Sequence, residues 1–227
     1  LVFEAAYHLN LDDLRRNLKP ILILTIPGVL ITTLLVGGVI SLGAGFSIQT
    51  ALLFGALVAA TDPDAVVALI RSLGVPKRLQ VLLEGESLLN DGTVIVLYNL
   101  LLSAILTGNF SVANSLTQFV SVAGGGLFVG FIIGWLLSQI ISRIDDHLLE
   151  TTLTSVLAYA AYLVGESIGV SGVMAVVAAG LVNGNLGTKG MSPTTRIVVY
   201  NFWEYAAFLA TNLVFLLIGL QINLAML

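Results

Sequence analysis

Residues 51–70 read ALLFGALVAATDPDAVVALI, two apolar segments separated by Thr61-Asp62-Pro63-Asp64. Neither segment alone reaches the roughly 20 residues that a helix needs to cross a bilayer, but together they do. Proline removes a backbone donor and clashes with the preceding turn, so Pro63 predicts a broken helix with freed carbonyl groups in mid-membrane. Unwound backbone at that depth lines a cavity or is buried in protein, as in the cation sites of secondary transporters. A second interpretation is that Thr61 or Asp62 only caps a helix beginning at Pro63.

The whole chain has the composition of a membrane protein. Of its 227 residues, 57% are hydrophobic and 10% are charged, and the mean hydropathy is +1.02, whereas roughly a quarter of the residues of a soluble domain are charged. The apolar runs lack the period-2 alternation of a membrane β-barrel, so we predict an all-α fold, a polytopic transmembrane helix bundle. The expected spans are 20–42, 48–73, 79–107, 115–142, 148–167 and 198–223, with a shorter seventh crossing at 168–184.

The basic residues predict the orientation of the bundle. All nine lie in linkers, and threading seven crossings places them on one side, which the positive-inside rule assigns to the cytoplasm. The opposite linkers, at 42–47, 108–114 and 165–172, contain no Lys or Arg. No basic run or stripe supports a nucleic-acid partner. The basic residues are Arg15, Arg16, Lys19, Arg71, Lys77, Arg78, Arg143, Lys189 and Arg196.

The acidic residues divide into two groups. Asp62, Asp64, Glu86 and Asp91 are flanked by apolar sequence, where a charge near the bilayer centre costs roughly 3 kcal/mol or more. Such residues are usually retained for transport or proton transfer, so these four are the candidate functional carboxylates. The others, beside basic linkers, are expected to be solvated surface charges: Asp12, Asp13, Asp145, Asp146 and Glu150.

A second polar motif begins the span after the proline. Residues 84–92 read EGESLLNDG. On a helix, Glu86 and Asn90 are four residues apart, as are Ser87 and Asp91, so each pair shares a face. One broad sector of this helix is therefore expected to be polar within the membrane.

The two motifs together offer the chemistry of an alkali-cation site. Hard cations such as Na⁺ prefer carboxylate, hydroxyl and carbonyl oxygens, which Thr61, Asp62, Ser87 and Asp91 supply. The alternative is an interhelical hydrogen-bond cluster that only holds the bundle together. For Glu86, an equally open interpretation is a structural ion pair with an arginine.

The segment Ala60-Thr61-Asp62-Pro63, followed by residues 84–92, resembles the Na⁺/H⁺ antiporters of the cation:proton antiporter-1 family. The resemblance covers essentially the whole chain, with further agreement in residues 11–16 (LDDLRR), 171–173 (SGV), 191–196 (MSPTTR) and 215–220 (FLLIGL). It implies an inverted-repeat antiporter fold and a homodimer. Because the chain opens abruptly at Leu1, residues 1–227 are expected to be part of a transmembrane domain whose first and last helices are missing.

The resemblance also implies roles for single residues. Thr61, Asp62, Ser87 and Asp91 would supply cation-site oxygens, and Asp91 would hold either H⁺ or Na⁺. Asn90 would brace the crossing helices, and members with an Asn-Asp pair tend to exchange one cation for one proton. Glu86 resembles a glutamate whose arginine partner lies on a later helix, outside these residues. Asp64 departs from the family pattern, in which an apolar residue is common, and would either attract cations or alter cation choice.

These observations predict a secondary active transporter in the cell membrane, not an enzyme. It would exchange a monovalent cation (Na⁺, Li⁺ or K⁺) for H⁺ by alternating access and need no cofactor beyond the transported ions. One rival is an intramembrane enzyme with an aspartate dyad, although neither Asp62 nor Asp91 lies in a Gly-x-Gly-Asp context. A second rival is a channel or a transporter of another solute.

Overall fold

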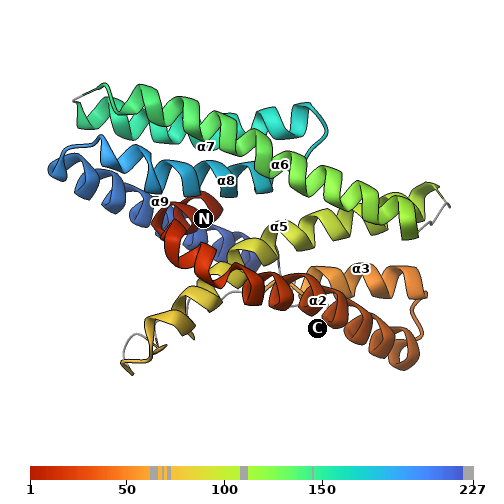
Figure 1. Ribbon diagram of the computed structural model, residues 1–227. Helices are drawn as coiled ribbons and strands as arrows, with labels where there is room; N and C mark the ends of the chain where they lie inside the picture. The colour runs from red at the N-terminus through yellow and green to blue at the C-terminus, as the bar shows by residue number, and fades with distance from the viewer. Residues whose placement is uncertain (62–65, 68, 71–72, 108–111, 145, 222–227) are drawn as a thin grey trace.

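The computed structural model describes residues 1–61, 66–67, 69–70, 73–107, 112–144 and 146–221. This part of the chain consists of helices joined by linkers and contains no β-strand, which confirms the predicted all-α class (Figure 1). The helices are α1 (Val2–His8), α2 (Leu11–Ala44), α3 (Ile48–Val58), α5 (Lys77–Thr107), α6 (Val112–Ile141), α7 (His147–Ser167), α8 (Gly172–Asn185), the 3₁₀ turn η1 (Gly187–Lys189) and α9 (Pro193–Gln221).

Five of the helices are long and apolar enough to cross a membrane, namely α2, α5, α6, α7 and α9. Each matches a span expected from the sequence to within a few residues, except that α2 begins nine residues earlier than expected. It starts at Leu11 because the side chain of Asn10 accepts hydrogen bonds from the N–H groups of Asp12 and Asp13, at 2.9 and 3.2 Å. These helices make the chain an integral, multi-pass membrane protein.

The expected span at 48–73 is not one continuous helix. α3 ends at Val58, and residues 66–67 and 69–70 are helical again. Pro63 lies outside the described residues, so the helix broken by proline stays a prediction.

α8 is short but central. Its 14 residues span about 21 Å, less than the roughly 30 Å of a hydrocarbon core, yet ten of the 14 are buried. Burial is this extensive because α8 packs against α6, α7 and α1. In Figure 1 it runs back beside α7 towards the end of the bundle where α6 finishes, as the predicted seventh crossing requires.

The glycine-rich stretch of α6 serves close packing against α8. A Cβ added at Gly130 would collide with the carbonyl oxygen of Ala175, and one at Gly126 would collide with that of Ser171. The backbones of the two helices are therefore in direct contact, which only residues without a side chain allow.

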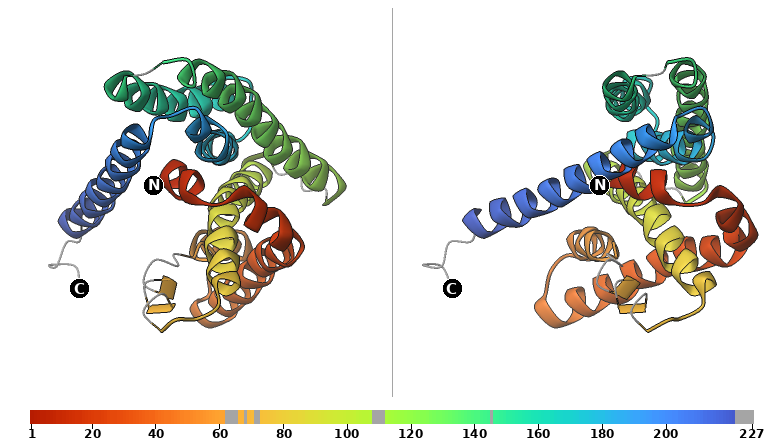
Figure 2. Two further views of the ribbon diagram at one scale, coloured as in Figure 1. Left: turned by 60° about the vertical axis from the view of Figure 1, so that its left-hand side comes forward. Right: turned by 90° about the vertical axis from the view of Figure 1, so that its left-hand side faces the viewer.

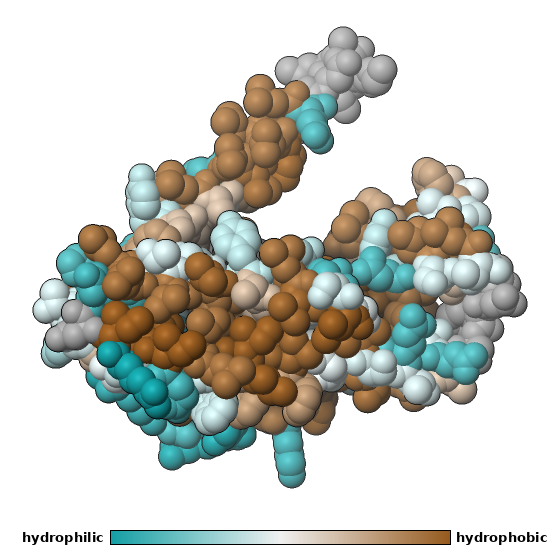
Figure 3. All heavy atoms as spheres, turned by 90° about the horizontal axis from the view of Figure 1, so that it is seen from above, coloured by the Kyte–Doolittle hydropathy of each residue, from teal (hydrophilic) through white to brown (hydrophobic). Residues whose placement is uncertain are grey.

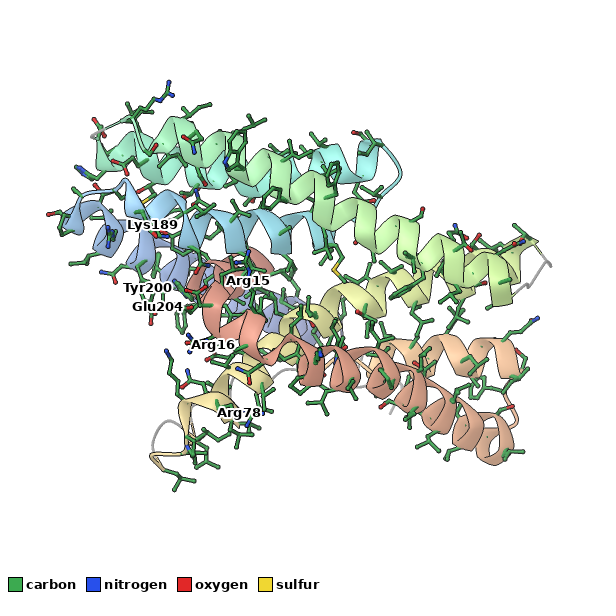
Figure 4. All side chains as sticks on the ribbon, in the orientation of Figure 1. Arg15, Arg16, Arg78, Lys189, Tyr200 and Glu204 are labelled. Carbon is green, nitrogen blue, oxygen red and sulfur yellow. The ribbon has the colours of Figure 1, made fainter. Side chains whose placement is uncertain are left out.

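The outer surface suits a lipid environment. Apolar side chains cover much of the face seen in Figure 3, and α9 extends away from the other helices (Figure 2). No described side chain of α9 beyond Trp203 is buried. The labelled basic residues Arg15, Arg16, Arg78 and Lys189 lie in one half of the molecule (Figure 4), in agreement with the one-sided distribution expected from the sequence.

Candidate functional site

The candidate site is built around the end of α3. The N–H of Ala59 still bonds to the carbonyl oxygens of Gly55 and Ala56, at 3.1 and 3.2 Å, in the manner of a closing helical turn. Ala60 and Thr61 are no longer helical. The carbonyl groups of this last turn therefore lack the intrahelical donors that a continuing helix would provide.

Polar side chains of α5 take the place of those donors. Ser87 Oγ donates to the carbonyl oxygen of Thr61 at 2.8 Å. Asn90 Nδ2 lies 3.2 Å from the carbonyl oxygen of Ala59 and 2.9 Å from Thr61 Oγ1. The irregular backbone after α3 is thus held by the polar sector that the spacing in residues 84–92 predicted.

Glu86 belongs to the same cluster. Its Oε1 accepts from Asn90 Nδ2 at 3.0 Å, and its Oε2 accepts from Thr61 Oγ1 at 3.3 Å. Its backbone oxygen accepts from Thr25 Oγ1 of α2 at 3.4 Å. Within the described residues, the carboxylate of Glu86 is therefore bound by an amide of its own helix and by a hydroxyl group of the backbone segment that follows α3.

Asn90 is the centre of the arrangement. It is 2% exposed, and its Nδ2 faces three acceptors although an amide nitrogen carries two hydrogens, so one of them is shared. Its Oδ1 is buried, and no residue in the described part of the chain donates a hydrogen bond to it. A buried oxygen without a donor is costly, which marks it as a group that can take a further ligand or proton donor.

Asp91 is half-buried on α5, one turn after Ser87 and on the same side of the helix. The following residue, Gly92, is packed tightly against the side chain of Met174 of α8. The segment that carries Asp91 is therefore clamped between the α3 end on one side and α8 on another. The sequence also singled out two further acidic residues and the proline between them. These residues, Asp62, Pro63 and Asp64, lie outside the described part of the chain.

Four polar residues outside this cluster, on α5, α7, α8 and α9, have local structural partners. Glu166 accepts from the N–H of Gly172 at 3.0 Å, and Glu84 accepts from Gln80 at 2.8 Å. Asn183 donates to Ser138 at 3.0 Å, and Asn212 donates to the carbonyl oxygen of Phe208 at 2.7 Å. Each of these bonds tightens a helix, a turn or a helix pair.

Sequence reasoning missed Thr25 and misjudged Glu150. Thr25 is fully buried against Glu86. The sequence feature that could have pointed to it is its polar side chain within the apolar run of α2. Glu150 was expected to be a solvated surface charge, but this is wrong because its side chain is 0% exposed. α9 covers that face of α7, since Trp203 Nε1 donates to Thr154, one turn after Glu150, at 3.0 Å.

Comparison with known proteins gives a consistent result. The profile of the family described as "Sodium/hydrogen exchanger, transmembrane" matches residues 1–227. The chain is 48% identical over 226 residues to a Na⁺/H⁺ antiporter of Aphanothece halophytica, covering 99% of this chain and 43% of the relative. It is 42% identical over 227 residues to a low-affinity Na⁺/H⁺ antiporter of Synechocystis, with coverage of 99% and 43%. The chain thus spans less than half the length of these relatives.

A solved structure shares the fold. It is the sodium proton antiporter of Methanocaldococcus jannaschii at pH 8, which superposes with a TM-score of 0.84 at 27% identity. The match covers 100% of this chain and 56% of that one. The similarity therefore extends over every helix described above.

Proposed function

Because this chain belongs to the sodium/hydrogen exchanger transmembrane family, we propose that it is part of a plasma-membrane transporter that exchanges a monovalent cation for H⁺. The cation is Na⁺, with Li⁺ or K⁺ as the chemically closest substitutes. The family is one of transporters, so an intramembrane enzyme with an aspartate dyad is excluded. Residues 1–227 form part of the transmembrane domain, and the full transporter is a homodimer.

The cation site of this proposal lies where α5 passes the end of α3. Asp91 carries either the cation or the proton, and Thr61, Ser87 and Asp62 contribute oxygens. The single observation that carries this assignment is the binding of Ser87 and Asn90 to the backbone after α3, at 2.8 and 3.2 Å. It brings hydroxyl and carbonyl oxygens, the ligands of hard cations, to the helix segment that bears Asp91.

Asn90 and Glu86 support the site from behind. Asn90 links α5 to the α3 end, and the carboxylate of Glu86 accepts from both Asn90 and Thr61. The buried Oδ1 of Asn90 is available to a cation or to a protonated carboxyl group. From the sequence, Pro63 is expected to break this helix, and Asp64 is expected either to attract cations or to alter cation choice.

Exchange follows from mutual exclusion at one carboxylate. A protonated Asp91 has lost the charge that holds the cation, and a cation-bound Asp91 has no place for the proton. If the transporter opens to either side only when Asp91 is occupied, one cation crosses for each proton, by alternating access. This is coupling through binding, and it needs no cofactor.

The test uses the full-length parent protein in liposomes with a pH-sensitive dye inside. An inward Na⁺ gradient is expected to drive H⁺ out of wild-type vesicles and to move no H⁺ when Asp91→Asn replaces the wild type. Glu84→Gln is the matched control, because Glu84 lies on the same helix outside the cluster and bonds to Gln80. Its activity should stay within about twofold of wild type, as for surface changes away from a site. Robust exchange by Asp91→Asn would place the proton carrier elsewhere, and H⁺ movement in the same direction as Na⁺ would indicate symport.

A further inference from the structure

A second polar site lies away from the α3–α5 junction, between the first turns of α2 and the start of α5. It is a pocket of about 360 Å³. Its lining residues are Asp13, Arg16, Asn17, Lys77, Arg78 and Val81. None of them belongs to the cation cluster, so the proposed exchange does not account for this pocket.

The pocket carries an excess of positive charge. It is lined by three cationic side chains and one carboxylate, and that carboxylate is already paired, since Asp13 Oδ2 lies 2.8 Å from Lys77 Nζ. Arg16 and Arg78 are therefore left as the two charges that are not neutralised within the lining. Among the described residues, no salt bridge compensates either guanidinium group.

The geometry holds one of these guanidinium groups in place. Asn17 is 8% exposed, and its Nδ2 donates to the backbone oxygen of Asp13 at 2.8 Å. This fixes the amide so that its Oδ1 accepts from Arg78 Nε at 3.1 Å. No described residue bonds to the two terminal nitrogens of Arg78, which therefore keep their donors for a ligand. A planar guanidinium presents such donors in pairs.

The position of the pocket along α2 and α5 is the one expected for the level of lipid headgroups. Arg16 and Arg78 stand at the beginnings of α2 and α5, before the apolar stretches of both helices. Figure 4 shows them in the half of the molecule that also holds Lys189, the side that the basic linkers assign to the cytoplasm. Basic pockets between helices at this level suit phosphorylated headgroups of anionic lipids.

We propose that this pocket binds a phosphate group, supplied by an anionic lipid headgroup or by free phosphate. Arg16 and Arg78 donate charge-assisted hydrogen bonds to the phosphate oxygens from the two helices. The paired Asp13 and Lys77 also line the pocket. Asp13 neutralises the charge of Lys77, which reduces the repulsion between the cationic side chains. The bound group thereby ties α2 to α5 at their cytoplasmic ends.

The experiment measures binding to the purified full-length parent protein in uncharged detergent by isothermal titration calorimetry. The two probes are dihexanoylphosphatidic acid, a short-chain anionic lipid, and inorganic phosphate. Saturable binding of the lipid alone identifies a headgroup site, and equal binding of both identifies a phosphate site; either result supports the proposal. If neither probe shows saturable binding, the proposal is overturned. This includes the case in which another part of the parent chain fills the pocket.

Variants assign the binding to this pocket. Arg16→Gln is expected to raise the dissociation constant of the bound probe by about tenfold or more, because it removes charge-assisted hydrogen bonds. Arg15→Gln is the matched control, since Arg15 is the neighbouring cation on α2 but does not line the pocket, and it should change the constant less than threefold. Arg78→Lys, which keeps the charge but loses the paired donors, should fall between them. Equal losses in Arg15→Gln and Arg16→Gln, or none in Arg16→Gln, would overturn the assignment.

Discussion

The side-chain nitrogen of Asn90 lies 3.2 Å from the carbonyl oxygen of Ala59, at the point where α3 has just ended. Because α3 ends at Val58, a continuing helix does not supply the donor for this carbonyl, and Asn90 supplies one from the neighbouring helix. The same nitrogen reaches Thr61 Oγ1 at 2.9 Å and Glu86 Oε1 at 3.0 Å. One buried amide therefore joins an irregular backbone to the acidic face of α5.

Replacing Asn90 with Ala should destabilise the protein more than an ordinary polar truncation. The change removes the donor from the buried carbonyl oxygen of Ala59 and from the part-buried bonds to Thr61 and Glu86, at a cost of about 1–3 kcal/mol. Asn212→Ala is the control, since Asn212 is exposed and donates to the carbonyl oxygen of Phe208 within α9, and it should cost under about 0.5 kcal/mol. Denaturant unfolding of the full-length parent in detergent measures both. Equal stability of the two variants would mean that the Asn90 bonds are weak.

The helices were predictable from the sequence because the length of an apolar run is a local property. The shared faces of Glu86 with Asn90, and of Ser87 with Asp91, followed from helical spacing alone. That the end of α3 meets this face could be expected only through the resemblance, because no pattern within one helix states which neighbour it touches.

What the sequence could not reveal depends on contacts between distant segments. Glu150 follows a basic linker and looks like a surface charge, but α9, about 50 residues later, folds over it. Thr25 has the sequence environment of an ordinary packing residue, and only the approach of α5 places it against Glu86. The cation-binding roles of Asp62 and Asp91 remain predictions.

Gly130→Ala is expected to be strongly destabilising, although alanine is the better helix former. Its Cβ would meet the carbonyl oxygen of Ala175 in the α6–α8 contact, and overpacking typically costs about 1–3 kcal/mol. Gly124→Ala is a control on the same helix, because a Cβ there meets nothing within 4 Å. It should be neutral or stabilising by up to about 1 kcal/mol. Thermal unfolding measures the stability of both variants. If Gly130→Ala is as stable as Gly124→Ala, the α6–α8 contact at Gly130 is loose.

Single cysteines at Phe46 and Lys189 should react from opposite sides of the membrane. Residues 1–227 contain no cysteine, so within this region each introduced thiol reports only its own position. Phe46 is exposed in the linker between α2 and α3, which lacks basic residues, and Lys189 follows α8 on the basic side. In inside-out vesicles an impermeant maleimide should label the Lys189 site and spare the Phe46 site. Labelling of both sites from one side would contradict the seven-crossing topology.

The apparent affinity for Na⁺ should fall as the pH falls. A proton and a cation that compete for Asp91 exclude each other. The proton on Asp91 must therefore leave before Na⁺ binds, and at lower pH a larger fraction of Asp91 is protonated. Where the carboxyl group is mostly protonated, this competition approaches a tenfold loss of apparent affinity per pH unit, by linkage. The measurement is the Na⁺ concentration that gives half-maximal exchange in liposomes, taken from about pH 6 to about pH 9 with equal pH on both sides at the start. Glu84→Gln should follow the wild-type curve, since Glu84 bonds to Gln80 outside the cluster. A Na⁺ affinity that stays constant over this range would mean that proton and cation occupy different groups, and Asp91 would then not be the shared carrier.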